Sequence, residues 1–179
     1  MKKIIYYVAT SLDGYIAGPN DDISMFSMDG KGVDQYLDDL QAFAAVIMGR
    51  RTYEFGYKFG LQPGQPAYPH MDHYIFSTTL QFEEQHAKIN VLEPNIDKIN
   101  ELRHNAKTDI YLCGGGEFAG WLLDHDQIDQ LKLKINPIVL GNGIRLFGNS
   151  NKSVNWVLTD FQQYKKGPQI ATYVLDKSK

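Results

Sequence analysis

The segment Ile110-Tyr111-Leu112-Cys113-Gly114-Gly115-Gly116-Glu117-Phe118-Ala119 shows most clearly how this chain is organised. Four apolar residues precede three glycines, which predicts a short buried strand that ends abruptly. The residues that follow predict a helix from Glu117 to Asp124. A helix that begins directly after glycines leaves its first amide groups unpaired and carries partial positive charge there, so a phosphate group fits at that end.

The glycine run has two interpretations. In one, Gly114 to Gly116 let an anion touch the main chain; in the other, they form only a tight turn between strand and helix. The run is neither GxGxxG nor a P-loop, because no Gly-Lys-Ser/Thr follows it. Glu117 bears on the choice, since a carboxylate in the first turn satisfies the helix dipole itself unless its side chain points outward.

Composition favours a small soluble partner. The chain has 179 residues, 43% of them hydrophobic, and no charged or Pro/Ser-rich linker divides it, so we expect one domain over residues 1–179. Its net charge is -3 and its lysines are scattered, whereas proteins that bind nucleic acids or anionic membranes concentrate positive charge. We therefore expect no nucleic-acid partner and no membrane partner.

Cysteine and histidine usage points to the cytoplasm and to no metal site. Cys113 is the only cysteine, and in a buried strand it behaves as a small hydrophobe, which suits a reducing compartment. Asp13 and Gly14 cut the apolar start too short for a signal peptide, and no stretch approaches the ~20 apolar residues of a membrane span. The histidines lack metal-ligand spacing, and we place all of them at the surface or in loops: His70, His73, His86, His104 and His125.

The first half of the chain alternates strands and helices. Residues 4–9 form an unbroken apolar run, typical of a central strand that is buried on both faces. Residues 10–30 carry turn signals and predict a long working loop. Residues 34–43 have apolar side chains at helical spacing, and residues 44–48 predict a second buried strand, which ends at Gly49 and leads into another helix.

The second half adds strands and then changes pattern. We predict strands at residues 73–76 and 89–92, a helix capped by Asn95 that runs to about His104, and late strands at residues 131–135, 154–159 and 170–175. No helix separates the last two strands, which indicates an antiparallel edge. The whole pattern predicts an α/β three-layer sandwich with a central mostly parallel sheet and an antiparallel C-terminal edge, whose ligand lies at the carboxyl ends of the strands.

Two arginines follow the glycine that ends the second strand. Arg50 and Arg51 are an unusual choice for the positive end of a helix, but together with Thr52 they suit phosphate oxygens. The alternative is that both arginines pair with surface carboxylates.

Four motifs together resemble the dihydrofolate reductase superfamily. They are Val8-Ala9-Thr10-Ser11-Leu12-Asp13-Gly14-Tyr15-Ile16-Ala17, Val46-Ile47-Met48-Gly49-Arg50-Arg51-Thr52-Tyr53, Cys113-Gly114-Gly115-Gly116-Glu117, and Pro137-Ile138-Val139-Leu140-Gly141 with Leu146-Phe147. The sequence is most similar to the reductase domain of the bifunctional riboflavin-biosynthesis deaminase/reductase and to free-standing relatives of that domain. The deaminase half is missing, because the chain has one cysteine and no HxE motif.

The resemblance implies a dihydrofolate reductase-like fold that binds NADPH. The backbones of Ala9 and Ile16 would meet the nicotinamide, while the remaining positions would hold the phosphates and the adenosine end. Arginine beside hydroxyl groups suits a 2′-phosphate, which favours NADPH over NADH. The resemblance also implies a cis peptide bond between Gly114 and Gly115. The implied cofactor-binding residues are Ala9, Ile16, Gly49, Arg50, Arg51, Thr52, Ser77, Thr78, Gly114, Gly115, Gly116 and Glu117.

The catalytic residue and the substrate follow less directly from the motifs. In folate reductases a carboxylate on the first helix grips the pteridine, and Asp34 falls near that position, with Tyr36, Leu37 and Asp38 close by. The alternative is that this acidic helix face is simply solvated. Met25-Phe26 stands where folate reductases have Pro-Trp, which argues against dihydrofolate itself. Several aromatic residues are further candidates for the wall of a flat-ring pocket: Tyr57, Phe59, Tyr68, Trp121 and Trp156.

The sequence is compatible with three functions. The first is an NADPH-dependent reductase that transfers a hydride to a small heterocyclic substrate, such as a pterin or a pyrimidinone. The second is a non-catalytic relict that still binds a dinucleotide, and the third is a structural protein whose glycine turns are only turns.

We also expect a homodimer through the late strands, because an edge strand with apolar side chains invites a second copy. Trp156 and Tyr173 are the expected anchors. The alternative is a monomer kept apart by edge charges at Lys132, Lys134, Lys165 and Lys166.

Overall fold

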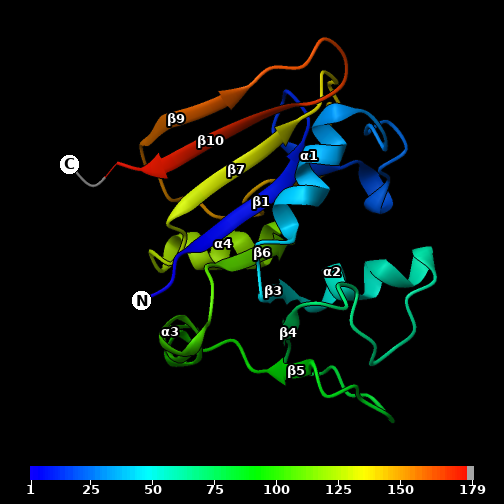
Figure 1. Ribbon diagram of the computed structural model, residues 1–179, viewed down its shortest axis with the longest axis vertical. Helices are drawn as coiled ribbons and strands as arrows, with labels where there is room; N and C mark the ends of the chain where they lie inside the picture. Colours follow the sequence, from blue (N-terminus) through cyan, green and yellow to red (C-terminus); the bar gives the residue numbers. More distant parts are fainter. Residues whose placement is uncertain (177–179) are drawn as a thin grey trace.

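The computed structural model describes residues 1–176 and contains an eight-stranded sheet with helices packed against it (Figure 1). Residues 177–179 of the expected domain lie outside the described residues. The strands lie in the order β5-β4-β3-β6-β1-β7-β10-β9. Their bounds are β1 (Ile4–Thr10), β3 (Ala45–Gly49), β4 (Asp72–Phe76), β5 (Ile89–Leu92), β6 (Ile110–Gly114), β7 (Gln130–Ile135), β9 (Trp156–Gln162) and β10 (Gln169–Leu175).

The strand directions confirm the predicted sheet. Every neighbouring pair from β5 to β7 is parallel, whereas β10 is antiparallel to both β7 and β9. In Figure 1 the two late strands, β9 and β10, form the upper edge of the sheet. The mostly parallel sheet with an antiparallel C-terminal edge is therefore as expected.

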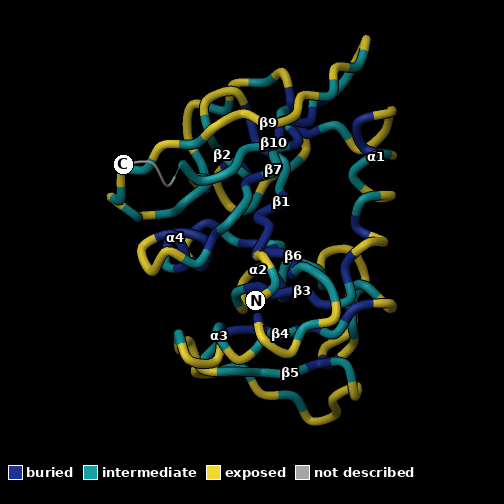
Figure 2. Tube along the Cα trace, turned by 60° about the vertical axis from the view of Figure 1, so that its left-hand side comes forward, coloured by how far each residue is buried: buried dark blue, intermediate teal, exposed yellow. Residues whose placement is uncertain are grey.

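Helices cover both faces of the sheet, which gives the three predicted layers. α1 (Lys31–Leu40) and α2 (Arg50–Phe55) pack on one face, and α3 (Ile96–Asn105) and α4 (Gly116–Asp124) pack on the other. Figure 2 shows the sheet between α1 and the pair α3 and α4, with the buried residues concentrated along the strands. Asn95 caps α3 as predicted, because its Oδ1 accepts a hydrogen bond of 2.7 Å from the amide of Asp97.

The apolar runs form central strands because both of their faces are covered. In β1, Ile4 and Tyr6 belong to the core on the α4 side, whereas Ile5 and Tyr7 belong to the core on the α1 side. Successive side chains of a strand point to opposite faces, so a strand between two helix layers has no position for a polar side chain. The buried central strand predicted for residues 4–9 is confirmed.

Several local features differ from the sequence-based expectation, among them β9, which spans Trp156–Gln162 instead of residues 154–159. The first helix spans Lys31–Leu40 instead of residues 34–43, because it begins directly after Gly30, whose φ is 94°. Phe43 lies beyond the helix but is still buried. A small second sheet, unpredicted because its strands are so short, pairs β2 (Tyr15–Ala17) with β8 (Ile144–Arg145). Two short 3₁₀ helices complete the elements, η1 (Pro19–Asp21) and η2 (Gly56–Phe59).

The placement of His73 was wrong. Its side chain is 0% exposed and lies in β4, not at the surface. Nδ1 lies 3.1 Å from the carbonyl oxygen of Met71, and Nε2 accepts a hydrogen bond of 3.2 Å from the amide of Tyr68. A neutral imidazole protonated on Nδ1 satisfies both contacts, so burial costs it no hydrogen bond.

In the described part of the chain, no helix combines the length and the apolar character that a membrane span requires.

Candidate functional site

A cavity of about 460 Å³ opens where the parallel strands β1, β3 and β6 end. This volume is within the range of ordinary small-ligand sites, roughly 300–1,000 Å³. The position at the carboxyl ends of parallel strands is the one that the sequence predicted. Of the predicted cofactor residues, those that line the cavity are Ala9, Ile16, Gly49, Arg50, Arg51, Thr52, Gly115, Gly116 and Glu117.

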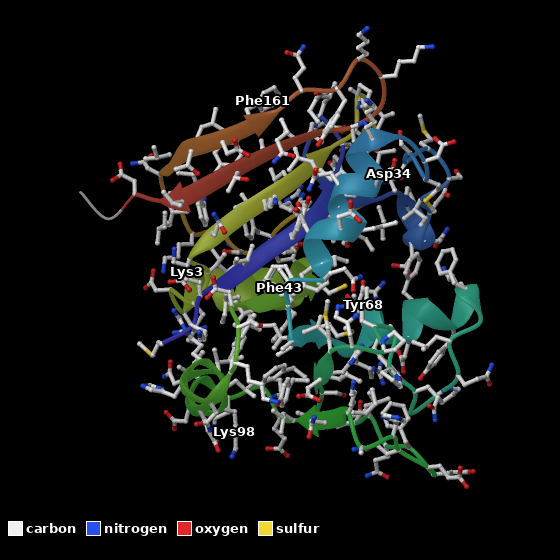
Figure 3. The ribbon with its side chains drawn as sticks, in the orientation of Figure 1. Lys3, Asp34, Phe43, Tyr68, Lys98 and Phe161 are labelled. Atoms are coloured by element: carbon white, nitrogen blue, oxygen red, sulfur yellow. The ribbon has the colours of Figure 1, made fainter. Side chains whose placement is uncertain are left out.

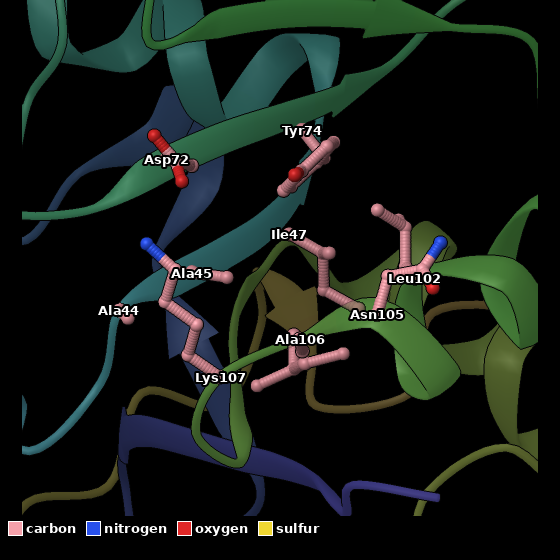
Figure 4. A pocket seen from close by; sticks show the side chains of 10 residues that line it. Ala44, Ala45, Ile47, Asp72, Tyr74, Leu102, Asn105, Ala106 and Lys107 are labelled. Atoms are coloured by element: carbon pink, nitrogen blue, oxygen red, sulfur yellow. The ribbon is translucent and has the colours of Figure 1, made fainter.

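A second hollow, shown in Figure 4, is smaller and differently placed. Its volume is about 80 Å³, and its lining includes Ala45, Asp72 and Ile110, the first residues of β3, β4 and β6. It therefore lies at the amino ends of these strands, opposite the glycine turns. The larger cavity is the candidate site, because only there do the motif residues converge.

The turn from β6 into α4 requires glycine because the backbone is crowded there. The peptide bond between Gly114 and Gly115 is cis, which confirms that prediction, and the φ of Gly114 is 127°. A Cβ atom on Gly116 would lie 2.2 Å from the carbonyl oxygen of Arg145, and one on Gly115 would lie 2.9 Å from Oγ1 of Thr52. The glycines thus keep side-chain atoms off the floor of the cavity and bring the start of α4 to its wall.

The side chain of Glu117 is engaged away from the start of its helix. Its Oε1 accepts a hydrogen bond of 2.8 Å from Nδ2 of Asn149, and the residue is exposed. Gly115, at the N-cap position of α4, has no side chain with which to cap the helix. The amide groups at the start of α4 are therefore not covered by a side-chain cap, which favours the anion-binding interpretation of the glycine run.

Both arginines at the start of α2 contact carboxylates, as the alternative interpretation predicted, and Arg50 also contacts a hydroxyl group. Nη1 of Arg50 donates to Oγ1 of Thr79 at 3.1 Å, and its Nε lies 3.6 Å from Oε2 of Glu54. Nη2 of Arg51 lies 3.4 Å from Oδ1 of Asp21. Both guanidinium groups are exposed at the cavity, so each is available to a phosphate, and such weak surface pairs cost little to exchange.

Ser77 and Thr78 do not line the cavity. Oγ of Ser77 accepts hydrogen bonds from the amides of Thr79 and Leu80, which stabilises the turn after β4, and Thr78 is exposed. Thr79 is the hydroxyl that contacts Arg50. The sequence predicted hydroxyl groups at the end of β4, but the conformation of the folded turn decides which of them contacts Arg50.

Asp13 anchors the loop that carries Ile16 over the cavity. Its carboxylate accepts hydrogen bonds from the amides of Leu140 and Gly141, at 3.1 and 2.7 Å. The Ser11 hydroxyl, together with these amides, lowers the pKa of Asp13 to about 2. The motif around Asp13 therefore joins the segments before β2 and β8, and so positions the wall to which Ile16 belongs.

The opposite end of the cavity is lined by residues that the sequence analysis did not assign to it. Tyr7 and Val8 of β1, Tyr36 of α1, and Tyr111 and Cys113 of β6 all belong to its lining. The hydroxyl oxygens of Tyr36 and Tyr111 lie 2.6 Å apart. Burial raises the pKa of both hydroxyls, so both stay protonated at neutral pH. Burial also raises the pKa of the Cys113 thiol, which lies 3.7 Å from the hydroxyl of Tyr68.

Asp34 lies outside the residues that line the cavity. It is exposed on α1, where Figure 3 labels it, while Tyr36 of the same helix lines the cavity. Residues two positions apart on a helix face different directions, so the fold directs Tyr36 rather than Asp34 to the site. The sequence offers Tyr36 only as a neighbour of Asp34 on the predicted helix, because the sequence does not determine the helix register.

The aromatic residues proposed for a flat-ring pocket do not line it either. Tyr57 packs on Tyr53, Phe59 packs on Phe55, and Trp121 stacks on Phe118 at 5.8 Å between ring centroids. Tyr68 packs edge to face on Tyr111 with ring centroids 5.8 Å apart, and Trp156 packs against the core on the α4 side. Among the residues that the structure describes, no group of three or more His, Cys, Asp or Glu is arranged to hold a metal ion.

Comparison with known proteins finds relatives that match nearly the whole chain. Residues 2–170 match the family model described as the RibD C-terminal domain. The uncharacterized protein YwjB of Bacillus subtilis (strain 168) is 28% identical over 173 residues, which cover 94% of this chain and 96% of that protein.

Solved structures share the fold. One from Shewanella sp. PV-4, whose name connects it with riboflavin biosynthesis, has a TM-score of 0.80 at 23% identity over 99% of this chain and 100% of that chain. Dihydrofolate reductase from Enterococcus faecalis, solved in complex with NADP(H), has a TM-score of 0.68 at 15% identity over 98% of this chain and 97% of that chain. The expected dihydrofolate reductase-like fold is confirmed.

Proposed function

The chain belongs to the RibD C-terminal domain family, and from that premise we propose that it is an NADPH-dependent reductase that transfers a hydride to a small heterocyclic substrate, such as a pterin or a pyrimidinone. One observation carries the proposal. The two strands that end in glycine, β3 and β6, bring the starts of α2 and α4 to the same cavity. Two helix starts that face one cavity, one of them with arginines, suit the phosphates of a dinucleotide.

The residues around the cavity fit NADPH chemically. Arg50, supported by Thr79, is placed for the 2′-phosphate, and the glycine floor at Gly115 and Gly116 admits the pyrophosphate to the amides of α4. Ala9 and Ile16 line the cavity and offer backbone groups to the nicotinamide. Bound NADPH supplies the hydride; the chain itself binds, orients and shields the reacting groups.

A relict site that binds a dinucleotide without turnover is the second candidate. It is favoured by the absence of Asp34 from the cavity: among the described lining residues the only carboxylates are Asp21 and Glu117, which contact Arg51 and Asn149. This alternative predicts binding of the cofactor with no reduction of any substrate.

Two measurements separate these candidates. A thermal-shift titration with NADPH and NADH reports cofactor preference, and NADPH oxidation with a panel of pterins, flavins, pyrimidinones and nitro compounds reports turnover. The reductase predicts a larger shift with NADPH and oxidation with at least one compound. A shift with either dinucleotide and no oxidation supports the relict. If neither cofactor shifts the melting temperature, both candidates are contradicted. The remaining interpretation is then that the glycine turns have only a structural role.

We further propose that the protein forms a homodimer through β9. Three apolar residues of this edge strand are about half exposed: Val157 at 48%, Leu158 at 52% and Phe161 at 51%. Phe161 is labelled on the upper strand in Figure 3. Exposed apolar residues on an unpaired edge favour pairing with a second copy.

The structure changes the details of the dimer hypothesis. Trp156 and Tyr173, the expected anchors, pack partly buried against the molecule's own core. Of the four lysines considered as edge charges, Lys132 pairs with Asp39 and Lys134 is 7% exposed, so neither is a free edge charge. Lys165 and Lys166 remain exposed in the turn between β9 and β10.

A further inference from the structure

The charges of the cavity are unevenly distributed along it. Among the described lining residues, the charged side chains are Asp21, Arg50, Arg51 and Glu117. They come from η1 and from the starts of α2 and α4, and their contacts are with one another or with Thr79, Glu54, Lys58 and Asn149.

The other end, which we call the tyrosine end, consists of Tyr7, Tyr36, Tyr111 and Cys113 and contributes no charged side chain to the lining. The rings of Tyr7 and Tyr36 meet edge to face with centroids 4.8 Å apart. An uncharged aromatic wall with hydroxyl groups suits a flat ring that carries a few hydrogen-bonding atoms.

Two lysines contact the rings of this wall but are not among the residues that line the cavity. Nζ of Lys132 pairs with Asp39 and lies 4.8 Å from the centroid of the Tyr7 ring. Nζ of Lys134 lies 4.8 Å from the centroid of the Tyr36 ring, and the residue is only 7% exposed. Each of these ammonium groups therefore lies against a tyrosine ring, and neither residue is among those that line the cavity. A phosphate or carboxylate at the tyrosine end would lose its hydration without gaining a cationic partner.

The hydroxyl groups at the tyrosine end are able to supply a hydrogen-bond donor to a ligand. The hydroxyls of Tyr36 and Tyr111 lie 2.6 Å apart, and either one is able to donate. Tyr111 is 1% exposed, whereas Tyr36 is partly exposed. The Tyr68 hydroxyl is a second hydrogen-bond neighbour of Tyr36. When Tyr111 and Tyr68 donate to the two acceptor sites of the Tyr36 hydroxyl, its single proton is left for an acceptor in the cavity.

We propose that the tyrosine end selects an uncharged planar heterocycle and that the hydroxyl of Tyr36 donates a hydrogen bond to a ring oxygen or nitrogen of this substrate. The inference rests on the proposed function and narrows its substrate class to compounds without a phosphate or carboxylate near the reacting ring. Reduction adds one hydride from the cofactor and one proton from water to the ring. Tyr36 keeps its own proton and stabilises the charge that develops on the acceptor atom, while Tyr111 positions it.

Matched pairs of ring compounds test the charge preference. Pterin and pterin-6-carboxylate share one ring system, as do uracil and orotate, and the second member of each pair carries a carboxylate directly on the ring. Dissociation constants are measured by fluorescence titration, without cofactor and with saturating NADP⁺. We expect the uncharged member of at least one pair to bind at least about tenfold more tightly than its anionic partner.

A variant tests the role of Tyr36. Tyr36→Phe removes one neutral donor, so we expect kcat/KM for the uncharged compound to fall roughly tenfold while the dissociation constant of NADPH is unchanged. Leu37→Ala, on the same helix with Leu37 53% exposed, is the matched control and should leave both values unchanged. Thermal unfolding verifies that each variant is folded, and binding of the uncharged compound gives a second readout that does not need turnover.

The inference is overturned if the anionic members bind as tightly as the uncharged ones, if no uncharged compound binds, or if Tyr36→Phe behaves like Leu37→Ala. Each of these results can occur while NADPH still binds, which separates failure of this inference from failure of the cofactor proposal. If the wild-type protein did not bind NADPH, the proposed function itself would be contradicted.

Discussion

A methyl group placed on Gly116 would lie 2.2 Å from the carbonyl oxygen of Arg145, which cannot move without shifting the backbone of β8. Ala is intrinsically better than Gly in a helix by roughly 1 kcal/mol. The clash outweighs this gain, because overpacking against a fixed group costs about 1–3 kcal/mol and this contact is far shorter than any that a Cβ atom normally makes. We expect Gly116→Ala to lower the free energy of unfolding by about 2 kcal/mol in urea denaturation.

Gly115→Ala is the matched comparison. There the close atom is Oγ1 of Thr52, at 2.9 Å, which belongs to a side chain that rotates. We expect a smaller loss of stability than at Gly116 and about a tenfold weaker binding of NADPH, since the added methyl and the displaced hydroxyl both intrude on the cavity floor. Equal stability losses at the two positions would contradict the distinction between a fixed and a movable neighbour.

Arg50→Ala should weaken NADPH far more than NADH. A charge-assisted hydrogen bond contributes about 1.5–3 kcal/mol, which corresponds to roughly a tenfold to hundredfold change in affinity. Arg51→Ala should act in the same direction. Isothermal titration with both cofactors measures the effects, and Lys98→Ala, on the exposed side of α3, is the control. Equal losses for NADPH and NADH would mean that the arginines serve the pyrophosphate instead of the 2′-phosphate.

The buried His73 should make the fold sensitive to mild acid. Burial lowers its pKa from 6.5 to about 4, so between these values the unfolded chain binds a proton that the folded chain does not. Its contribution to stability is therefore complete above pH 6.5 and is lost as the pH falls toward 4. With about 1.4 kcal/mol for each pKa unit, we expect a loss of about 2 kcal/mol between pH 7 and pH 4.5.

Urea denaturation at both pH values, for the wild type and His73→Gln, isolates this contribution. At pH 7 the variant should be less stable than the wild type, because the glutamine amide does not reproduce both contacts of the imidazole. Between pH 7 and pH 4.5 its free energy of unfolding should fall by about 2 kcal/mol less than that of the wild type. Parallel losses in the two proteins would show that other groups account for the acid sensitivity.

Light scattering tests the proposed dimer. At micromolar concentration we expect a mass of about twice the 20.3 kDa of one chain, and we expect Leu158→Glu to restore the mass of a single chain by placing a charge on β9. Leu37→Glu, at an equally exposed leucine on α1, should leave the dimer intact. A wild-type mass of 20.3 kDa at every concentration would refute the proposal.

Much of the fold followed from short-range features of the sequence. The apolar runs of β1, β3 and β6 are buried on both faces in the structure, and runs of this kind have few alternatives to a sheet covered by helices. The glycines at the ends of β3 and β6 marked the edge of the sheet where the cavity lies. At Gly116 the crowded backbone leaves no room for a side chain. Family motifs around these turns therefore located the proposed cofactor end of the site.

Tertiary structure alone decided the rest, because it depends on register and on contacts between distant segments. α1 begins three residues earlier than expected. On this helix Asp34 is exposed and Tyr36 lines the cavity. The pairing of Tyr36 with Tyr111, 75 residues away, and of Arg50 with Thr79 arises only when the helices dock on the sheet. Local sequence sets where strands and turns form, whereas the directions of side chains at a shared cavity are set by the packing of the whole chain.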